Sequence, residues 1–361
     1  MLSAASQRQL FIQLYVLSLR SSRLLRHKTR FRNSSTTLQP TGDKRVKFLE
    51  LSPDHLAAVR KAIRPTTLIR SPRLDELVGA EILIASETFQ YTGSFKFRAA
   101  YSAALRSPAS RLIAASSGNF GQALAYAASL MNKEAIIVMP DNSAAVKVEA
   151  VKRFGGRVEL VETKKVSRAQ RVSELSEQYP DAQVLSAYDH DDVIAGNSTL
   201  AAELAERAGE YDAVIVPVGG GGLSAGLVMG LQQAGSKMEV FGAEPLLAND
   251  GKRSLDAGKI IVNEGEPQTI ADGARTLSLG VRNWAILHKG IKDILEVKEE
   301  DIESAIRSLF NLANLKSEPT GGLALGAAVA HKHLFQGKRV ICIVSGGNVD
   351  TEVFLRIVGK K

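Results

Sequence analysis

Short apolar runs alternate with helical patterns along most of this 361-residue chain, and this alternation constrains the fold more than any other feature. Apolar runs of about five residues, often rich in β-branched side chains, are typical of buried strands. Helical patterns of roughly 10–15 residues between them indicate crossover connections, which make the strands parallel and cover both faces of a sheet. The strands are too numerous for one sheet. We therefore predict an α/β fold with two domains, each built on a parallel twisted sheet flanked by helices.

The same pattern predicts where the elements lie. We expect strands at residues 82–85, 112–115, 135–139, 157–161, 184–187, 213–218, 239–243 and 340–344. We expect helices at residues 53–63, 99–105, 121–131, 144–154, 167–178, 193–208, 223–234, 302–315 and 322–333. The predicted division is a leader at 1–45, a small domain at 111–189, and a large domain formed by 46–110 and 190–361.

The net charge of +8 is concentrated in one segment. Residues 1–42 contain seven Lys and Arg and no Asp or Glu, which leaves +1 for the rest of the chain. The remainder therefore lacks the basic excess typical of nucleic-acid-binding domains, and we expect no nucleic-acid partner. No run approaches the ~18 apolar residues of a membrane-spanning helix, so we expect no membrane partner either.

The leader is rich in Arg and Ser and has no acidic residue, which is the composition of a transit peptide. We favour an organellar presequence, with a secretory signal or untranslated sequence before a later start as alternatives. The expected localisation is mitochondrial or cytoplasmic. The single cysteine, Cys342, lies inside an apolar strand pattern, so an intramolecular disulfide is excluded and a core position is predicted.

The strongest local signal is a run of four glycines between a predicted strand and a predicted helix: Gly219, Gly220, Gly221 and Gly222. Without side chains, the backbone N–H groups can turn towards an anion, and the helix N-terminus lies behind them. A phosphate ester is the expected ligand. The loop has no Gly-Lys-Ser/Thr ending, which argues against an ATP-type site. A nicotinamide dinucleotide remains an alternative, because Glu244 ends the next strand where a ribose-binding acid would lie.

Two other polar loops follow predicted strands. One contains Ser116, Ser117, Gly118 and Asn119, whose polar groups at a helix start can hold a carboxylate or simply cap the helix. The other contains Ser345, which can bind a ring nitrogen or cap the residues that follow. Because open α/β sheets collect their ligands at strand C-termini, we expect these loops to meet.

A lysine, Lys96, lies in the stretch 91–98 between a predicted strand and a predicted helix. It is either an ordinary solvated lysine or a buried reactive amine. Taken alone, the solvated form is the more common, because lysine is among the most exposed residue types. The other loops change this judgement only if they gather around Lys96.

Together, four stretches resemble the motifs of the fold-type II pyridoxal-phosphate (PLP) enzymes, and most of all their serine/threonine dehydratase and serine racemase branch. The stretches are Thr92-Gly93-Ser94-Phe95-Lys96, Ser116-Ser117-Gly118-Asn119, Gly219-Gly220-Gly221-Gly222 and Ser345-Gly346-Gly347-Asn348. The resemblance extends from about residue 50 to the end of the chain. It implies a tryptophan synthase β-like fold, PLP as cofactor, a small amino-acid substrate and a homodimer.

The resemblance also implies a role for each motif. Lys96 would form the Schiff base with PLP and, once freed, act as general base beside the substrate Cα. The glycine loop and the Leu223 N–H would hold the PLP phosphate. Asn119 would contact the ring hydroxyl and Ser345 the pyridine nitrogen. The substrate carboxylate would be held by Ser116, Ser117, Gly118 and Asn119.

The acidic loop 244–250 is similar to the divalent-cation site of the racemase branch. The ligands implied are Glu244, the Ala248 carbonyl and Asp250, and hard oxygen ligands of this kind suit Mg²⁺ or Ca²⁺. This resemblance weakens the case for Glu244 as a ribose ligand. Three positions depart from the family pattern: Phe120 replaces the usual His, Ala99 a common Gly, and Thr320 the usual Ser.

The expected activity is that of an L-threonine/L-serine ammonia-lyase, which releases ammonia and a 2-oxo acid by α,β-elimination. A serine at the pyridine nitrogen cannot hold a proton there as a carboxylate would, and the weaker electron sink favours loss of the β-hydroxyl over transamination. Ser117 keeps two alternatives open, a serine racemase and a 3-hydroxyaspartate dehydratase, because its hydroxyl could return a proton to Cα. A nicotinamide-dinucleotide-binding module is the alternative outside these classes.

Overall fold

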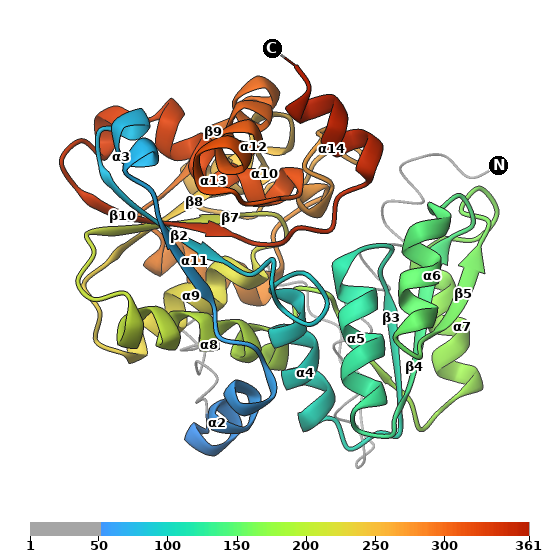
Figure 1. Ribbon diagram of the computed structural model, residues 1–361. Coiled ribbons are helices and arrows are strands. Elements are labelled where there is room, and N and C mark those ends of the chain that lie inside the picture. Colours follow the sequence, from blue (N-terminus) through green and yellow to red (C-terminus); the bar gives the residue numbers. More distant parts are fainter. Residues whose placement is uncertain (1–51, 361) are drawn as a thin grey trace, which may run out of the picture. The chain divides into compact units, whose positions relative to one another are not determined.

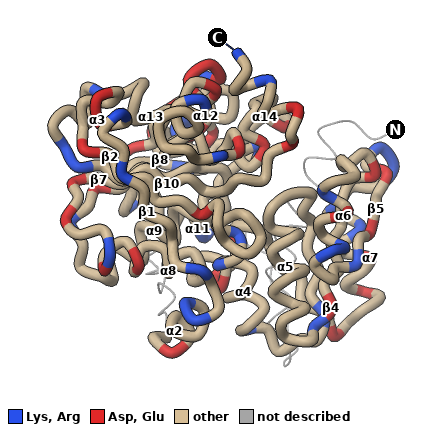
Figure 2. The backbone as a smooth tube through the Cα atoms, in the orientation of Figure 1, with Lys and Arg blue, Asp and Glu red and all other residues tan. Residues whose placement is uncertain are grey.

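The computed structural model describes residues 52–360, and the predicted leader lies outside them. Within this part, two sheets are flanked by helices (Figure 1). The prediction of an α/β fold with two parallel sheets is confirmed. Basic and acidic residues are interspersed along its helices and loops (Figure 2). None of the described helices is long and apolar enough to cross a membrane.

The larger sheet has six strands in the order β1-β2-β10-β7-β8-β9. They are β1 (Thr67–Arg70), β2 (Glu81–Ser86), β7 (Ala213–Pro217), β8 (Glu239–Pro245), β9 (Asp293–Val297) and β10 (Arg339–Val344). Neighbouring strands are parallel except β1, which is antiparallel to β2. The loops after β2, β7 and β10 therefore leave the sheet at one edge, where ligands of such sheets bind.

Helices cover both faces of the larger sheet (Figure 1). One face packs against α3 (Pro72–Val78), α12 (Glu299–Ala313), α13 (Pro319–Ala330) and α14 (Thr351–Val358). The other packs against α8 (Asp191–Arg207), α9 (Gly222–Gln233) and α11 (Val281–Gly290). In β2, Ile82 and Ile84 enter the first core and Leu83 and Ala85 the second, because successive side chains of a strand point to opposite faces.

The smaller sheet has four parallel strands in the order β5-β4-β3-β6. They are β3 (Arg111–Ala115), β4 (Glu134–Pro140), β5 (Arg157–Val161) and β6 (Gln183–Val184). One face packs against α4 (Lys96–Arg106) and α5 (Asn119–Ser129), and the other against α7 (Arg168–Gln178). The helix α4 thus packs with the smaller sheet although it precedes residue 111, and the predicted domain boundaries stay a prediction.

Several elements differ from the sequence prediction. Six were not expected: β1, β9, α3, α11, α14 and α10 (Asp250–Ala257). β1 and β9 are edge strands, and two acidic residues interrupt the apolar pattern of β9. Most of the predicted strand 184–187 is irregular, since β6 ends at Val184. Helix α4 begins three residues earlier than predicted, at Lys96, because its apolar run starts only at Ala99.

Candidate active site

The loops that follow β2 and β10 are joined along their backbones. The Phe95 N–H donates to the Ser345 carbonyl at 2.9 Å, and the Gly347 N–H donates to the Gly93 carbonyl at 2.9 Å. These bonds hold the turn that carries Lys96 against the turn that carries Ser345. Two of the predicted motifs, some 250 residues apart in the sequence, therefore form one structural unit.

Lys96 is the first residue of α4, and it is partly buried. Its Nζ donates to the Ala187 carbonyl in the turn after β6, at 2.8 Å. Phe95 and Phe120 place their ring centroids 4.9 and 5.9 Å from this nitrogen. Burial lowers the pKa of Lys96 to about 8, because the charged amine loses its water, while the nearby Glu318 carboxyl opposes the shift.

Glu318 is a site residue that the sequence prediction missed. Its carboxyl group is 4% exposed and accepts hydrogen bonds from Asn119 Nδ2 at 2.9 and 3.0 Å. Burial raises the pKa of Glu318 to about 8, with a further contribution from Asp272. A signal was available in the sequence: Glu318 directly precedes α13, whose residues are buried nearly all round, so no solvated helix face exists for the acid.

The four glycines join β7 to α9 as predicted, and their packing explains why side chains are excluded. Gly221 has a left-handed backbone with φ of 88°, which glycine adopts at little cost. A Cβ at Gly220 or Gly222 would overlap Tyr188. The N–H groups here and at Leu223 precede the hydrogen-bonded turns of α9, so they are free to point at an anion.

The loop after β3 brings Ser116, Ser117 and Asn119 to the start of α5. The Ser116 hydroxyl accepts the N–H groups of Gly118 and Gly121, at 3.4 and 3.1 Å, so its side chain serves as a local cap. Ser117 is partly buried. Asn119 reaches the larger sheet through Glu318, and its Oδ1 also accepts a 2.8 Å hydrogen bond from the side chain of Asn348 in the loop after β10.

Buried hydroxyls test whether these residues fit PLP. Ser345 is 1% exposed, and its Oγ has no hydrogen-bond partner within the described residues. The hydroxyls of Ser94 and Thr92 are likewise buried and unpaired there. Buried polar atoms in native proteins nearly always have a partner, so these three indicate a polar ligand. A partly buried lysine, a glycine loop for phosphate and an unpaired hydroxyl beside them fit PLP.

The comparison with known proteins agrees with this geometry. A family model described as pyridoxal-phosphate dependent enzyme matches residues 59–346. The chain belongs to this family. The L-threo-3-hydroxyaspartate ammonia-lyase of Saccharomyces cerevisiae is 36% identical over 307 residues, which cover 84% of this chain and 94% of the relative. Human serine racemase is 35% identical over 320 residues, covering 84% and 92%. The crystal structure of a threonine deaminase from T.th. is similar with a TM-score of 0.77 and 39% identity, covering 83% and 99%.

In this PLP-dependent enzyme, the three residues predicted to bind a metal lie between the end of β8 and the start of α10, but the side chains of Glu244 and Asp250 have other partners. Glu244 accepts the N–H groups of Gly251 and Lys252, at 3.1 and 2.5 Å, and so caps α10. Asp250 accepts a 2.9 Å hydrogen bond from Asn263, while its other oxygen is buried and unpaired. Burial raises the pKa of Glu244 well above its usual range. The described residues contain no group of three or more His, Cys, Asp or Glu that could hold a metal ion.

The three departures from the family pattern have visible surroundings. Phe120 is 1% exposed and packs in the core beside Lys96. Thr320 accepts a 3.0 Å hydrogen bond from the Gly273 N–H, and the Gly273 carbonyl in turn lies against Gly219 of the glycine loop. Ala99 is fully buried in the core of the smaller sheet. Phe120 thus lies beside Lys96, and Thr320 contacts the glycine loop through Gly273.

Proposed function

We propose that the protein is a PLP-dependent ammonia-lyase that converts L-threonine and L-serine to a 2-oxo acid and ammonia by α,β-elimination. The observation that carries this proposal is the Lys96 amine, which is partly buried beside the turn of Ser345 and has a pKa of about 8. Support comes from the similarity to threonine deaminase and to ammonia-lyases.

The pKa of Lys96 bears directly on its role as a base. Lowering the pKa from 10.5 to about 8 increases the fraction of neutral amine near neutral pH on the order of a few hundredfold. Bound PLP supplies the electron sink for the bond broken at Cα. Lys96 takes the Cα proton, and the buried position of its amine keeps competing water away.

The other residues hold the reactants. The N–H groups of the glycine loop and Leu223 bind the cofactor phosphate at the start of α9. Ser345 donates to, or accepts from, the ring nitrogen. Asn119 contacts the ring hydroxyl. The N–H groups and hydroxyls from Ser116 to Asn119 bind the substrate carboxylate, with Ser117 rather than the engaged Ser116 hydroxyl as the side-chain donor.

Serine racemisation is a second candidate, and Ser117 is the observation that favours it. Ser117 lies in the loop between β3 and α5, in a different segment from Lys96, so its hydroxyl is suited to reach Cα from another side. Human serine racemase is among the similar proteins. Elimination from 3-hydroxyaspartate is a third candidate, supported by the similarity to the yeast L-threo-3-hydroxyaspartate ammonia-lyase. No observation favours a nicotinamide dinucleotide, since Glu244 is occupied by the N–H groups of α10.

A bound Mg²⁺ or Ca²⁺ at Glu244, Ala248 and Asp250 is part of the proposal, supported by the unpaired oxygen of Asp250. Adding Ca²⁺ to chelator-treated protein should raise the thermal midpoint of the native chain and leave that of Asp250→Asn unchanged. An equal response in both proteins, or none in either, would remove the metal from the proposal. The homodimer is likewise proposed, and light scattering of the purified protein tests it.

The function is tested by reconstituting the purified protein with PLP and assaying L-Ser, L-Thr, D-Ser and 3-hydroxyaspartate for oxo acid and for inverted enantiomer. We expect a yellow absorbance that borohydride bleaches, together with oxo acid from L-Thr and L-Ser. A protein that binds no PLP under these conditions would contradict the proposal. If only 3-hydroxyaspartate yields oxo acid, the proposed substrate is wrong. If the amino acid is inverted and no oxo acid forms, the proposed reaction is wrong.

A further inference from the structure

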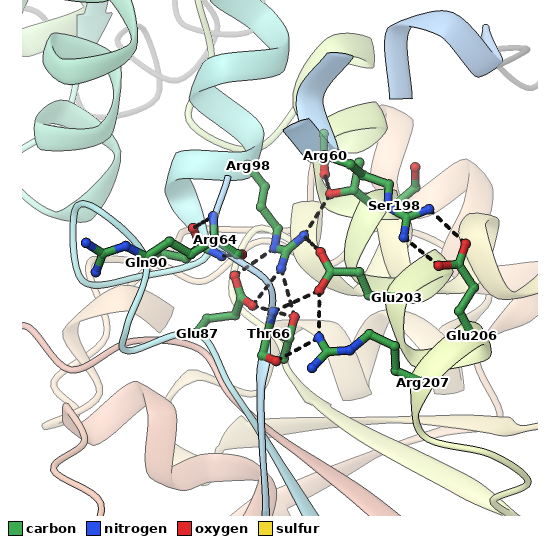
Figure 3. A network of polar contacts seen from close by, with 12 residues as sticks. Arg60, Arg64, Thr66, Glu87, Gln90, Arg98, Ser198, Glu203, Glu206 and Arg207 are labelled. Atoms are coloured by element: carbon green, nitrogen blue, oxygen red, sulfur yellow. Dashed lines mark hydrogen bonds and ion pairs between the residues drawn. The ribbon is translucent and has the colours of Figure 1, made fainter. Parts of the chain in front are cut away.

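A buried arginine on α4 binds two buried carboxylates at once (Figure 3). The Arg98 guanidinium donates to both oxygens of Glu87, at 2.7 and 2.9 Å, and to Glu203 at 2.7 Å. It also donates to the hydroxyls of Thr199 and Thr66, at 3.1 and 2.8 Å. Arg98 and Glu87 have no exposed side-chain surface. Every N–H group of this guanidinium fork is thus directed at a protein acceptor.

The partners of Arg98 come from the larger sheet. Glu87 follows β2, and its backbone N–H donates to the Val344 carbonyl at 2.9 Å, one residue before Ser345. Glu203 comes from α8, which covers the larger sheet. Arg98 therefore fastens the first turn of α4 to the strand end from which the turn of Ser345 also starts.

The backbone of α4 is held at the same place. Gly196 of α8 lies so close that a Cβ atom there would overlap the Arg98 carbonyl oxygen. Residues in a helix advance by about 100° each, so side chains two positions apart point to nearly opposite sides. Lys96 accordingly points to Ala187, while Arg98 points back into α8 and β2. A displacement of Arg98 would be transmitted to Lys96, because both residues lie in the first turn of α4.

Stability alone does not explain this arrangement, because buried ion pairs often contribute no more than apolar residues of the same volume. Planar, multidentate binding instead fixes geometry. We propose that Arg98 is a positioning residue, whose binding to Glu87 and Glu203 sets the place of the Lys96 amine relative to the turn of Ser345. The inference rests on the proposed function, in which Lys96 is the catalytic amine.

The central variant is Arg98→Lys, which keeps the charge but loses the planar fork, so it cannot bind both carboxylates in the same way. We expect PLP to react more slowly with Lys96. The rate is measured from the rise of the visible absorbance, and mass spectrometry of the borohydride-trapped peptide identifies the lysine that reacted. We expect kcat per PLP-bound site to fall roughly 10- to 100-fold, because a displacement of about 1 Å has costs of this size. KM should stay within about twofold.

Two further variants make the result interpretable. Arg60→Lys is the matched control, because Arg60 also binds both oxygens of an α8 glutamate, Glu206, but at the exposed surface. It should leave the rates unchanged. Thr199→Val removes one hydrogen bond to Arg98 and keeps the side-chain volume. It should slow PLP attachment and kcat in the same direction, by roughly twofold to fivefold.

The outcomes separate a positioning role from a structural one. A lower thermal midpoint in Arg98→Lys and Thr199→Val, with native PLP attachment and native kcat per bound site, would overturn the inference. If Arg98→Lys does not fold, Thr199→Val decides by the same criterion. The proposed function fails separately, if the native protein binds no PLP or releases no oxo acid from L-Thr and L-Ser.

Discussion

The two sheets contribute to the candidate site by different kinds of bond. The turns of Lys96 and Ser345 belong to the larger sheet's edge and are joined by backbone hydrogen bonds. The smaller sheet presents Ser117 and Asn119, and Asn119 reaches the larger sheet only by side-chain bonds among those described, one of them to Glu318. Backbone pairing fixes the turns of Lys96 and Ser345, which we propose hold the cofactor, whereas the side-chain bonds of Asn119 can be exchanged when a substrate enters.

A second contact between the sheets has the same exchangeable character. Lys147 of α6 (Ala145–Arg153) forms a 3.0 Å ion pair with Asp272, just ahead of the Gly273 that borders the glycine loop. Both side chains are more than one-third exposed, and ion pairs of this kind contribute little. We infer from this comparison that the larger sheet forms a fixed side, held by backbone bonds, and that the contacts of the smaller sheet form an adjustable side, held by side-chain bonds.

The largest effect is expected on the fixed side, from Lys96→Ala. Loss of the amine removes both the covalent attachment of PLP and the base at Cα. We expect oxo acid release to fall at least about 1000-fold, with loss of the yellow absorbance and little change in thermal midpoint. Activity that survives this substitution would show that the catalytic amine lies elsewhere.

On the adjustable side, Ser117→Ala is expected to separate two reactions. Without the hydroxyl, no group at this position returns a proton to Cα, so racemisation of serine should vanish while elimination stays within about fivefold of the native rate. Chiral chromatography and an oxo acid assay on the same sample measure both. Equal loss of the two activities would mean that Ser117 mainly binds the substrate carboxylate.

The bond between the sheets can be tested through the pH dependence of stability. The folded pKa of Glu318, about 8, lies above its ordinary value of 4.5. The folded state therefore keeps this proton more tightly, so the contribution to stability is present below pH 4.5 and is lost as pH rises towards 8. Denaturant titrations of the apoprotein should show this decline, of the order of a few kcal/mol, and Glu318→Gln should flatten it.

The matched control for this experiment is Glu206→Gln, which changes an exposed carboxyl on α8. It should leave the decline between pH 4.5 and 8 in place. A decline that persists unchanged in Glu318→Gln would contradict the assignment to Glu318.

The smallest effect is expected from Lys147→Ala. Its exposed ion pair with Asp272 should contribute at most about 1 kcal/mol to the free energy of unfolding. Because the pair spans the adjustable side, we expect KM for L-Thr to change by roughly twofold to threefold while the yellow absorbance stays native. A loss of PLP binding in this variant would break the distinction between the two sides.

The sequence predicts the motifs well because each depends on local physics. A glycine run between strand and helix, and polar residues after apolar strands, indicate ligand loops without any knowledge of distant contacts. Lys96 alone is ambiguous, and only its combination with polar loops that follow other strands distinguishes it. The alternation of strands and helices likewise predicted most of both sheets.

The missing parts depend on contacts between segments far apart in the chain. Glu318 meets Asn119 across 199 positions, and Glu203 meets Arg98 across 105. In the sequence Glu203 looks like an ordinary surface residue, and the apolar helix after Glu318 hints at burial without indicating its partner. The edge strands β1 and β9 have weaker patterns. β1 has no buried residue, and two acidic residues interrupt the apolar run of β9.

The buried position of Cys342 has a practical consequence. The chain's single thiol has no exposed surface in the centre of the larger sheet, and burial raises its pKa to about 12. Reagents that need a thiolate will therefore not react with Cys342 in the native protein. A cysteine introduced on each sheet would carry a fluorescent or spin label without background, and the distance between the labels would report on movement as substrate binds.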